Sequence, residues 1–369
     1  MRTILRKITN RLFSRRLMLW LEDLLIRIYS TPNPVTRRWE LPVVFLMYRV
    51  VLFVRGGQEF DIYRLEGIPA NQKEPITLMY FQSGHGLEYL AKEMFCENEF
   101  RSEKVGSCRW WKLAKQAEEA AARADVVVIE RNTLIRWTPR RGQWLRTPTW
   151  VSMAMEINPG LPWEEVKKQM HSQHSNIRAI KKWNFTYTVN HDSCDFDFFY
   201  EHMYLPYITQ RYPESGFTDS KSHLRNIFEH GFLAQIGLPG GDPIAAVVSL
   251  RRGELQFSVA LGVLEANNTW LDAGVISALY YYQIKHAYDD GLRRVDVGGA
   301  RPFLNDGLFQ YKYRWGMRPV LDYWNPREWL IWIPNGSEAA RLWAAEHPIV
   351  PDFLRTGGQK ARSSSTNPV

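Results

Sequence analysis

Asp296 is the residue whose type and setting most directly suggest chemistry. It stands between Val295 and Val297 in the short apolar run R-R-V-D-V-G-G, residues 293–299. Burial disfavours the charged form of a carboxyl group and raises its pKa, and such a carboxylate can act as a general base toward an ammonium group. The alternative is a structural carboxylate that bonds to neighbouring backbone groups at the end of a strand.

Basic side chains that could hold an anion lie on both sides of this segment in the sequence. Arg178 and Lys181 are three residues apart, so a helix would place them on one face, where they could clamp a phosphate or carboxylate of a substrate. Arg301 follows a Gly-Gly pair and could reach an anionic acceptor. For all three residues the alternative is a solvated surface position.

Several common catalytic signatures do not occur in the sequence. It has no G-x-x-x-x-G-K-[ST], G-x-G-x-x-G, G-x-S-x-G or H-E-x-x-H motif, so P-loop, dinucleotide-binding, α/β-hydrolase and zincin functions lack their chemical core. His171 and His174 have no further ligand placed beside them, and we expect no metal site. Cys96, Cys108 and Cys194 are widely spaced and odd in number, which fits a reducing compartment better than a disulfide framework.

Length and composition indicate a folded protein with an elaborated α/β domain or two lobes. The chain has 369 residues, of which 45% are hydrophobic and 23% charged. The net charge of +8 is concentrated in residues 1–38, which hold nine basic and two acidic side chains, whereas residues 39–351 have a net charge of −1. The body of the chain is therefore not a general polyanion-binding surface.

The first 38 residues combine their positive charge with apolar residues at helical spacing. They predict a basic amphipathic arm, which either lies on an anionic membrane surface or docks on the protein itself. The apolar run 17–29 is interrupted by Glu22, Asp23 and Arg27, and no small-residue cleavage site follows it. We therefore expect no export signal and no transmembrane helix, and a cytoplasmic protein whose arm would be the contact if it associates with the inner face of the membrane.

The elements that must position these residues alternate between strands and helices, which predicts an α/β fold. Strands are predicted at 41–54, 76–80, 126–130, 149–157, 185–189, 232–238, 244–250, 254–261, 293–299 and 317–324, and helices at 86–99, 109–124, 162–183, 196–211, 219–230, 273–290 and 304–314. The strands at 244–250 and 254–261 are joined by Arg-Arg-Gly, a three-residue connection typical of hairpins. Residues 357–369 resemble a disordered tail.

The order of hairpin, long helix, acidic strand, short helix and final strand between Ile244 and Tyr323 resembles the second half of a GNAT acyltransferase fold. The segments R-R-V-D-V-G-G (293–299), N-D-G-L-F-Q-Y-K-Y-R-W-G (305–316) and H-S-N-I-R-A-I-K-K-W-N-F (174–185) are similar to those of the Fem-type and BioF-associated branch. The resemblance covers about residues 145–325. It implies a GNAT-like mixed sheet with flanking helices and two GNAT-like lobes, to which the basic arm at the N-terminus is added.

By this resemblance the protein is expected to be an N-acyltransferase that moves an acyl group, from acyl-CoA such as acetyl-CoA, to an amine of a sugar, amino acid or peptide. Lys312 matches the lysine at the transfer site of this branch, where a cation would stabilise the oxyanion that forms as the amine attacks. The alternative is a solvated helix lysine. In this family the sheet splays between two central strands, where backbone groups hold the donor, and the next helix N-terminus offers N–H groups to phosphates.

The donor site departs from the usual acetyltransferase pattern. Where relatives have Q/R-x-x-G-x-G/A, this sequence has N-N-T-W-L-D-A-G, in which Gly274 alone remains for close approach and Asp272 would repel a pyrophosphate. Asn268 and Gly274 are the candidates for donor contact, together with Tyr281, one of three consecutive tyrosines of which at most two can face one cleft. No permanently bound cofactor is expected.

Two alternatives to the acyl-CoA enzyme remain. A Fem-type enzyme would use an aminoacyl-tRNA donor, and the arm would then add phosphate contacts with a strong dependence on salt. A catalytically inactive GNAT-like protein would instead bind partners at a membrane through the arm. In each case the expected division is an arm at 1–38, a diverged GNAT-like lobe at 39–157, an acyltransferase lobe at 158–335 and a C-terminal segment at 336–369.

Overall fold

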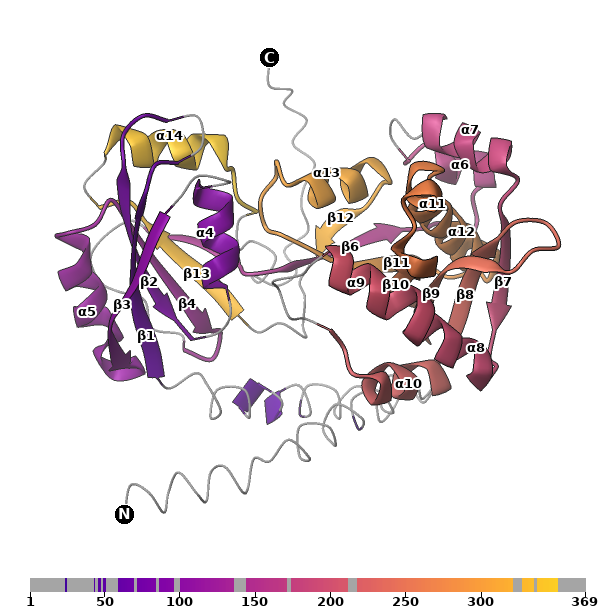
Figure 1. Cartoon of the computed structure of the whole chain (residues 1–369), viewed down its shortest axis with the longest axis horizontal. Helices are drawn as coiled ribbons and strands as arrows, with labels where there is room; N and C mark the ends of the chain where they lie inside the picture. The colour runs from indigo at the N-terminus through magenta and orange to yellow at the C-terminus, as the bar shows by residue number, and fades with distance from the viewer. Residues whose placement is uncertain are drawn as a thin grey trace. The chain divides into compact units, whose positions relative to one another are not determined.

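Two mixed sheets form the framework of the described chain (Figure 1). The computed structural model describes residues 59–69, 72–83, 86–95, 100–135, 144–170, 174–211, 218–320, 327–334 and 337–350, with Leu24, Val43, Leu46, Met47, Arg49 and Val50 as separate helical positions. Contacts divide the chain into two units. Unit 1 includes Ser152–Arg301 and Asn305–Pro319, and unit 2 includes Glu59–Val151, Pro302–Leu304 and Val320–Val369.

The sheet of unit 1 has the strand order β12-β6-β11-β10-β9-β8-β7 among the described residues. Its strands are β6 (Val151–Glu156), β7 (Thr186–Asn190), β8 (Phe232–Gly237), β9 (Pro243–Arg252), β10 (Leu255–Val263), β11 (Arg294–Ala300) and β12 (Arg318–Val320). β7 to β10 pair antiparallel, with β9 and β10 as the predicted hairpin, whereas β10 and β11 run parallel. The parallel pair requires a crossover, and the helix between the two strands provides it.

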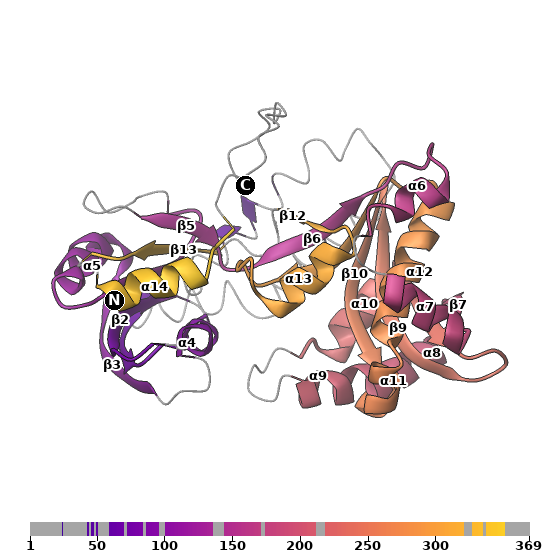
Figure 2. The same ribbon diagram turned by 90° about the horizontal axis from the view of Figure 1, so that it is seen from above.

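Helices cover both faces of this sheet. They are α6 (Trp163–Lys167), α7 (His174–Trp183), α8 (Ser193–Phe198), a π-helical segment (Phe199–Tyr204), α9 (Leu205–Arg211), α10 (Lys221–Glu229), α11 (Asn268–Asp272), α12 (Val275–Asp289) and α13 (Gly307–Arg314). Val248 of β9 packs in a core with Phe196 and Leu224 of α8 and α10, whereas its neighbour Ser249 bonds to Gln283 of α12. Because successive side chains of a strand point to opposite faces, α12 and α10 lie on opposite sides of β9 (Figure 2).

Gly262 of β10 lies directly against the π-helical segment. A Cβ atom at this position would come within 2.4 Å of the Met203 backbone carbon and 2.5 Å of the Tyr204 nitrogen. We expect Gly262→Ala to lower the free energy of unfolding by about 1–3 kcal/mol, because backbone must move to admit the methyl group. Urea unfolding tests this, with Gly307→Ala as the control, since a Cβ there meets no described atom within 4 Å. Equal losses in the two variants would contradict the packing argument.

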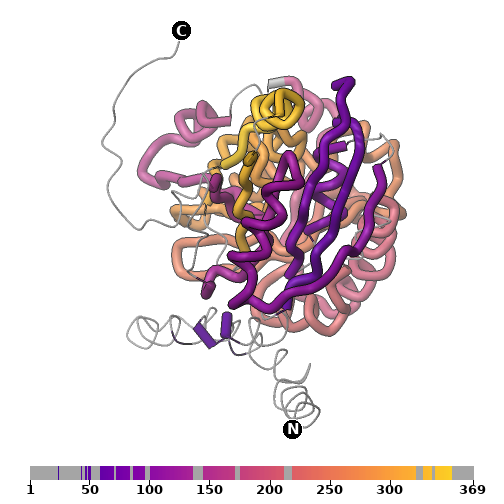
Figure 3. Tube along the Cα trace, turned by 90° about the vertical axis from the view of Figure 1, so that its left-hand side faces the viewer, coloured from indigo at the N-terminus to yellow at the C-terminus, as the bar shows by residue number. Residues whose placement is uncertain are grey.

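Unit 2 is built on a sheet with the strand order β3-β1-β2-β4-β13-β5 in the described part of the chain. Its strands are β1 (Glu59–Gly67), β2 (Ile76–Gln82), β3 (Phe100–Arg109), β4 (Val126–Asn132), β5 (Leu145–Pro148) and β13 (Arg327–Trp332), and its helices are α4 (Leu87–Phe95), α5 (Leu113–Ala121) and α14 (Glu338–Glu346). Leu90 of α4 and Trp343 of α14 share one core with Tyr80 and Trp329 of the sheet. Figure 3 shows the yellow α14 beside indigo and purple elements of the same unit, from which it is far removed in sequence.

The predicted α/β fold with two lobes is confirmed, because each unit is a mixed sheet with flanking helices. The single helix predicted at 162–183 is wrong: α6 ends at Lys167 and α7 begins at His174. The strand predicted at 41–54 is wrong at its described positions, which are helical and include the exposed side chains of Leu46 and Met47. Apart from Leu24, the arm predicted at 1–38 lies outside the described residues, as does the tail at 357–369.

The units are not continuous in sequence, so their limits differ from the predicted ones at 157/158 and 335/336. β6 pairs within the sheet of unit 1, whereas β13 inserts between β4 and β5 of unit 2. α14 then packs on the same unit 2 core. No described helix is both long and apolar enough to cross a bilayer.

Candidate functional site

The parallel strands β10 and β11 separate soon after they meet. They pair only over Leu255–Phe257 and Arg294–Asp296, although both strands continue well beyond this point. On its other side β10 has a bulge, because its register against β9 shifts between Ser258 and Ala260. A bulge bends its strand and increases the local twist. The described strands therefore diverge past Phe257 and Asp296, and their facing edges share no ladder there.

Asp296 stands where this opening begins. Its side chain is buried, and its Oδ1 accepts a hydrogen bond from the Gly298 N–H at 2.9 Å. Gly298 has φ +78°, in the left-handed region that favours glycine, and a Cβ there would lie 3.6 Å from the Ser258 carbonyl oxygen. The carboxylate thus holds a turn of β11 close to the bulge of β10, which is the structural role considered for it. The same side chain is close enough to Lys312 to influence its charge.

Lys312 of α13 is the buried cation of this region. Its side chain is only 4% exposed, so it is not a solvated helix lysine. Its Nζ donates to the carbonyl oxygens of Val297 at 3.0 Å and Gly299 at 2.7 Å, on either side of the Gly298 turn. An ammonium group has three protons, and the third has no hydrogen-bond partner among the described residues.

Burial also tunes the charge of Lys312. Desolvation lowers its pKa to about 8, while the negative charges of Asp296 and Asp306 act in the opposite direction. A shift of this size corresponds to about 3 kcal/mol of preference for the neutral form relative to an exposed lysine. The folded pKa lies below the unfolded one, so this burial weakens folding below pH 8, and the effect is relieved as pH rises from 8 toward 10.5. At neutral pH the side chain is still mainly a cation.

Arg301 lies at the start of the helix that carries Lys312. Asp306 caps α13 by accepting the Phe309 N–H at 2.8 Å, and the Arg301 Nε is 3.9 Å from the Asp306 Oδ2. Arg301 is therefore half-buried beside this cap rather than isolated on the surface. Its predicted role toward an anionic acceptor stays a prediction.

The start of α12 contains Gly274 but not Asn268. Gly274 is the N-cap residue of α12, with φ +86°, and a Cβ there would have no described atom within 4 Å. The space beside the Gly274 Cα is thus open at the N-terminus of this 15-residue helix, whose first N–H groups have no partner within the helix. Asn268 is exposed on α11, and it is Asn267 whose Oδ1 caps that helix by accepting the Thr269 N–H at 2.8 Å. The Ser277 and Tyr311 hydroxyls, 2.8 Å apart, tie α12 to α13.

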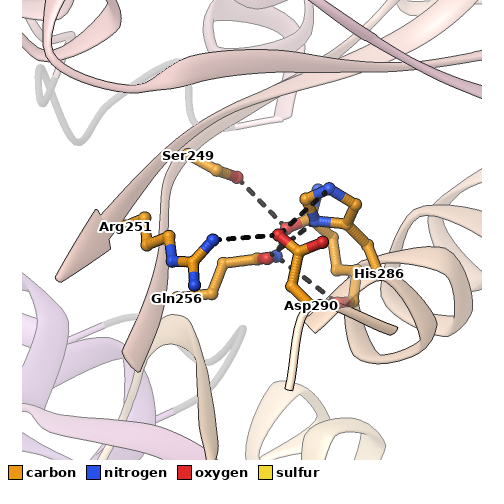
Figure 4. Close-up of polar contacts among 6 residues, drawn as sticks. Ser249, Arg251, Gln256, His286 and Asp290 are labelled. Carbon is orange, nitrogen blue, oxygen red and sulfur yellow. Dashed lines mark hydrogen bonds and ion pairs between the residues drawn. The ribbon is translucent and has the colours of Figure 1, made fainter. Parts of the chain in front are cut away.

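A buried polar network behind the opening was not foreseen from the sequence (Figure 4). Gln283 of α12 accepts hydrogen bonds from the Ser249 hydroxyl at 3.1 Å and the Ser258 hydroxyl at 3.2 Å, and also contacts Gln256. Gln256 in turn contacts the His286 Nδ1 at 3.0 Å. The network ties α12 to β9 and to the bulge of β10. Its residues are separated by hairpin and helix in the sequence, so no local spacing signals it.

The outer end of this network carries charge. Asp290 lies 3.3 Å from the Arg251 guanidinium and 3.8 Å from the His286 Nε2 (Figure 4). Burial lowers the pKa of His286, whereas Asp290 acts to raise it. Among described residues no three His, Cys, Asp or Glu side chains gather as metal ligands.

Lys181 of α7 and Tyr281 of α12 line the same cavity, and Lys312 of α13 does not line it. The cavity lies between α7 and α12 and has a volume of about 380 Å³. Arg178 is exposed on α7 and does not line this cavity. Of the sequence-predicted residues, Asp296 and Lys312 therefore lie together and Lys181 and Tyr281 line the cavity, whereas Arg178, Asn268 and Gly274 belong to neither group. Lys181 was expected to hold a substrate and Tyr281 a donor, and neither role is tested by their positions.

Three solved structures illustrate what this chain is similar to. FemX is 14% identical, with 70% of this chain and 81% of that chain covered and a TM-score of 0.39. L-PGS from Bacillus licheniformis is 11% identical, with coverages of 85% and 96% and a TM-score of 0.38. A GCN5-related N-acetyltransferase from Sphaerobacter thermophilus is 14% identical, with coverages of 69% and 71% and a TM-score of 0.32.

No protein-family model and no curated protein matches the sequence. Because these TM-scores lie below 0.5, we take function from the geometry of the site and from the motifs in the sequence.

Proposed function

We propose that this protein is an acyltransferase that joins an acyl group to an amine in the opening between β10 and β11. The observation that carries the proposal is the buried ammonium of Lys312, which is held beside Gly298, the glycine of β11 next to Ser258 of β10, with one proton unused by the described residues. A fixed cation in a dry site stabilises a developing oxyanion far better than a solvated one. The match of Lys312 to the aromatic-Lys motif of the Fem-type branch supports the same role.

Two features support a donor with a long polar arm. The edges of β10 and β11 offer backbone groups that no shared ladder uses, and the start of α12 beyond Gly274 offers N–H groups to a phosphate. Acyl-CoA has such an arm and is the donor we propose. Asp272 disfavours a pyrophosphate close to this helix start, so an aminoacyl-tRNA, with single phosphodiesters, is the second candidate.

The proposed reaction assigns one role to each charged residue. Asp296 takes a proton from the acceptor's ammonium group, and the resulting amine attacks the donor's carbonyl carbon to form the new C–N bond. Lys312 donates its third N–H to the oxyanion. The oxyanion collapses and the C–S bond of the thioester breaks; the thiolate takes up one of the two protons of the nitrogen, the amide keeps the other, and Asp296 returns its proton to solvent. The acceptor is an amine of a sugar, amino acid or peptide.

Thermal unfolding of the full chain with CoA, acetyl-CoA and a longer acyl-CoA tests the donor. A ligand at 100 times its Kd adds about 2.7 kcal/mol to stability. The proposal predicts a rise in the melting midpoint with acyl-CoA, and amide formation when amines are supplied. Asp296→Asn should lower that rate while keeping the thermal shift.

Two other outcomes separate the alternatives. If no CoA species shifts the midpoint and a charged tRNA supports transfer to an amine, the aminoacyl-tRNA reaction replaces the proposed one. If neither donor binds or reacts, the protein is not an acyltransferase with these donors, and a non-catalytic binding role takes its place.

A further inference from the structure

The cavity between α7 and α12 is lined by neither Lys312 nor the residues that hold it, although α12 also borders α13 through Ser277 and Tyr311. Its volume is about 380 Å³, within the range of about 300–1,000 Å³ typical of small-ligand sites. We propose that it binds a small amphiphilic anion, meaning a carboxylate or phosphate head on an apolar body. This inference does not depend on the proposed acyltransferase reaction.

The interior suits the apolar body of such a ligand. Ile177 and Ile180 of α7, Phe185 just after it, and Tyr281 and Tyr282 of α12 all line the cavity. Aliphatic and aromatic side chains of this kind gain free energy when they exclude water from an apolar ligand. The cavity therefore favours a hydrocarbon or ring over a fully polar solute.

The walls are held in place before any ligand arrives. The Tyr282 hydroxyl donates to the Phe185 carbonyl oxygen at 2.7 Å, which joins the end of α7 to α12. The Tyr282 ring stacks on the Tyr187 ring with their centroids 5.5 Å apart. On the other side, the Tyr281 ring meets the Trp163 ring edge to face at 5.9 Å. A preformed wall lowers the ordering cost of binding.

The charge of the lining selects the head group. Lys181 from α7 and Lys285 from α12 line the cavity, and no carboxylate does. Lys285 pairs with Asp289 and lies over the Trp163 ring, 5.4 Å from its centroid. Lys181 forms no ion pair with any described residue. Each helix thus supplies one ammonium group to a cavity whose lining has no carboxylate, and Lys181 is the one that no described acid pairs with, which suits a single anionic head.

Asn184 adds a neutral polar group to the same lining. It ends α7 with φ +51°, a left-handed conformation that asparagine tolerates better than most residues. Its backbone N–H donates to the Lys181 carbonyl oxygen at 3.2 Å. The turn brings an amide side chain beside the lysines, where it can donate to an oxygen of the head.

Calorimetric titration of the full chain with four probes tests the proposal. Octanoate and octyl phosphate present the two heads on one tail, inorganic phosphate presents a head alone, and octyltrimethylammonium presents the tail with a positive charge. We expect at least one of the two octyl anions to bind at least tenfold more tightly than both inorganic phosphate and the cation. The better octyl anion identifies the head as carboxylate or phosphate.

Lys181→Gln and Lys182→Gln form the matched pair of variants. Both lysines are exposed on α7, but only Lys181 lines the cavity. A charge-assisted hydrogen bond contributes about 1.5–3 kcal/mol, so Lys181→Gln should weaken octyl anion binding about tenfold or more, while Lys182→Gln leaves it unchanged. Ile177→Ala should weaken both octyl anions and leave phosphate unaffected.

The proposal is overturned if the cationic probe binds as well as the anions, if no octyl anion binds, or if the two lysine variants behave alike. Lys312→Met separates this site from the proposed reaction, because it should leave octyl anion binding intact. Loss of octyl anion binding in Lys312→Met would show that the probes occupy the β10–β11 opening instead and would also overturn the assignment. Absence of acyl transfer with normal octyl anion binding would remove the proposed function and keep this site.

Discussion

Replacing Lys312 with Met is expected to lower kcat for acyl transfer by about 10²–10³, with little change in donor binding. Removal of one oxyanion donor costs enzymes a factor of this size. Lys312 is buried and donates hydrogen bonds to the carbonyl oxygens of Val297 and Gly299. These two bonds fix the orientation of the ammonium group and therefore the direction of its third N–H. Methionine keeps the length and apolar character of the stem but provides no proton and no charge. Steady-state kinetics with acyl-CoA and an amine measure the effect.

The pH dependence gives the same test a second readout. The pKa of Lys312 is lowered to about 8 by burial, and the ammonium form is the one that stabilises an oxyanion. Activity of the unmodified chain should therefore fall as pH rises through about 8, and this descending limb should be absent from the residual activity of Lys312→Met. Lys182→Met is the control, since Lys182 is exposed on α7. If the activity of Lys312→Met still falls as pH rises through about 8, the fall is due to the ionisation of another group.

Folding of the Lys312→Met variant must be checked in parallel. The substitution removes the cost of a buried ammonium but leaves two carbonyl oxygens without their donor, and each lost partner costs about 1–3 kcal/mol. These effects oppose each other, so the melting midpoint should move little. A large fall in the midpoint would mean that the lost rate reflects unfolding rather than chemistry.

The central strands β8, β9 and β10 of unit 1 could be predicted because each is a separate, mainly apolar run. β9 is a continuous buried run, β10 alternates between buried and half-buried positions, and both strands lie where the sequence predicted them. β3 could not be predicted in this way, since F-R-S-E-K-V-G-S-C-R is an almost fully exposed edge strand whose pairing with β1 leaves no apolar signature. The pairing of β13 with β4 joins distant segments, which no local pattern encodes.

The two charged side chains of the candidate site could be predicted from the sequence, whereas the backbone groups that position them could not. Lys312 and Asp296 were found because a lysine motif and an acidic residue in an apolar strand are visible in the sequence. The partners that position them are the carbonyl groups of Val297 and Gly299 and the N–H of Gly298, and backbone groups carry no residue-type signal. Arg178 and Lys181 lie on one helix, yet only Lys181 lines the cavity, since the position of α12 decides which face is covered.

The second large effect is expected in unit 2, where Arg131→Met should destabilise the sheet by about 3–5 kcal/mol. Arg131 and Glu328 are directly paired on β4 and β13, both buried, with the Nε and Nη2 of Arg131 each 2.8 Å from the Glu328 Oε1. Without Arg131, the nearest described cation of Glu328 is Arg146, at 3.6 Å. A buried carboxylate that loses its close partner destabilises the folded state, because attraction to a cation no longer offsets the free energy of its desolvation. Hydrogen exchange at the β4 and β13 amides measures the loss locally, without assuming that the two units unfold together.

The double variant Arg131→Met/Glu328→Leu separates the charge from the packing. If the single variant is unstable because it leaves a charge behind, removing that charge should restore most of the lost protection, since apolar pairs often replace buried ion pairs at little cost. An equally unstable double variant would instead assign the effect to the shape of the two side chains. The pair also has a consequence for register: a one-residue shift of β13 would move Glu328 to the opposite face of the sheet from Arg131. If the double variant regains its hydrogen-exchange protection but β13 pairs with β4 in more than one register, the ion pair is what fixes the register of β13 between β4 and β5.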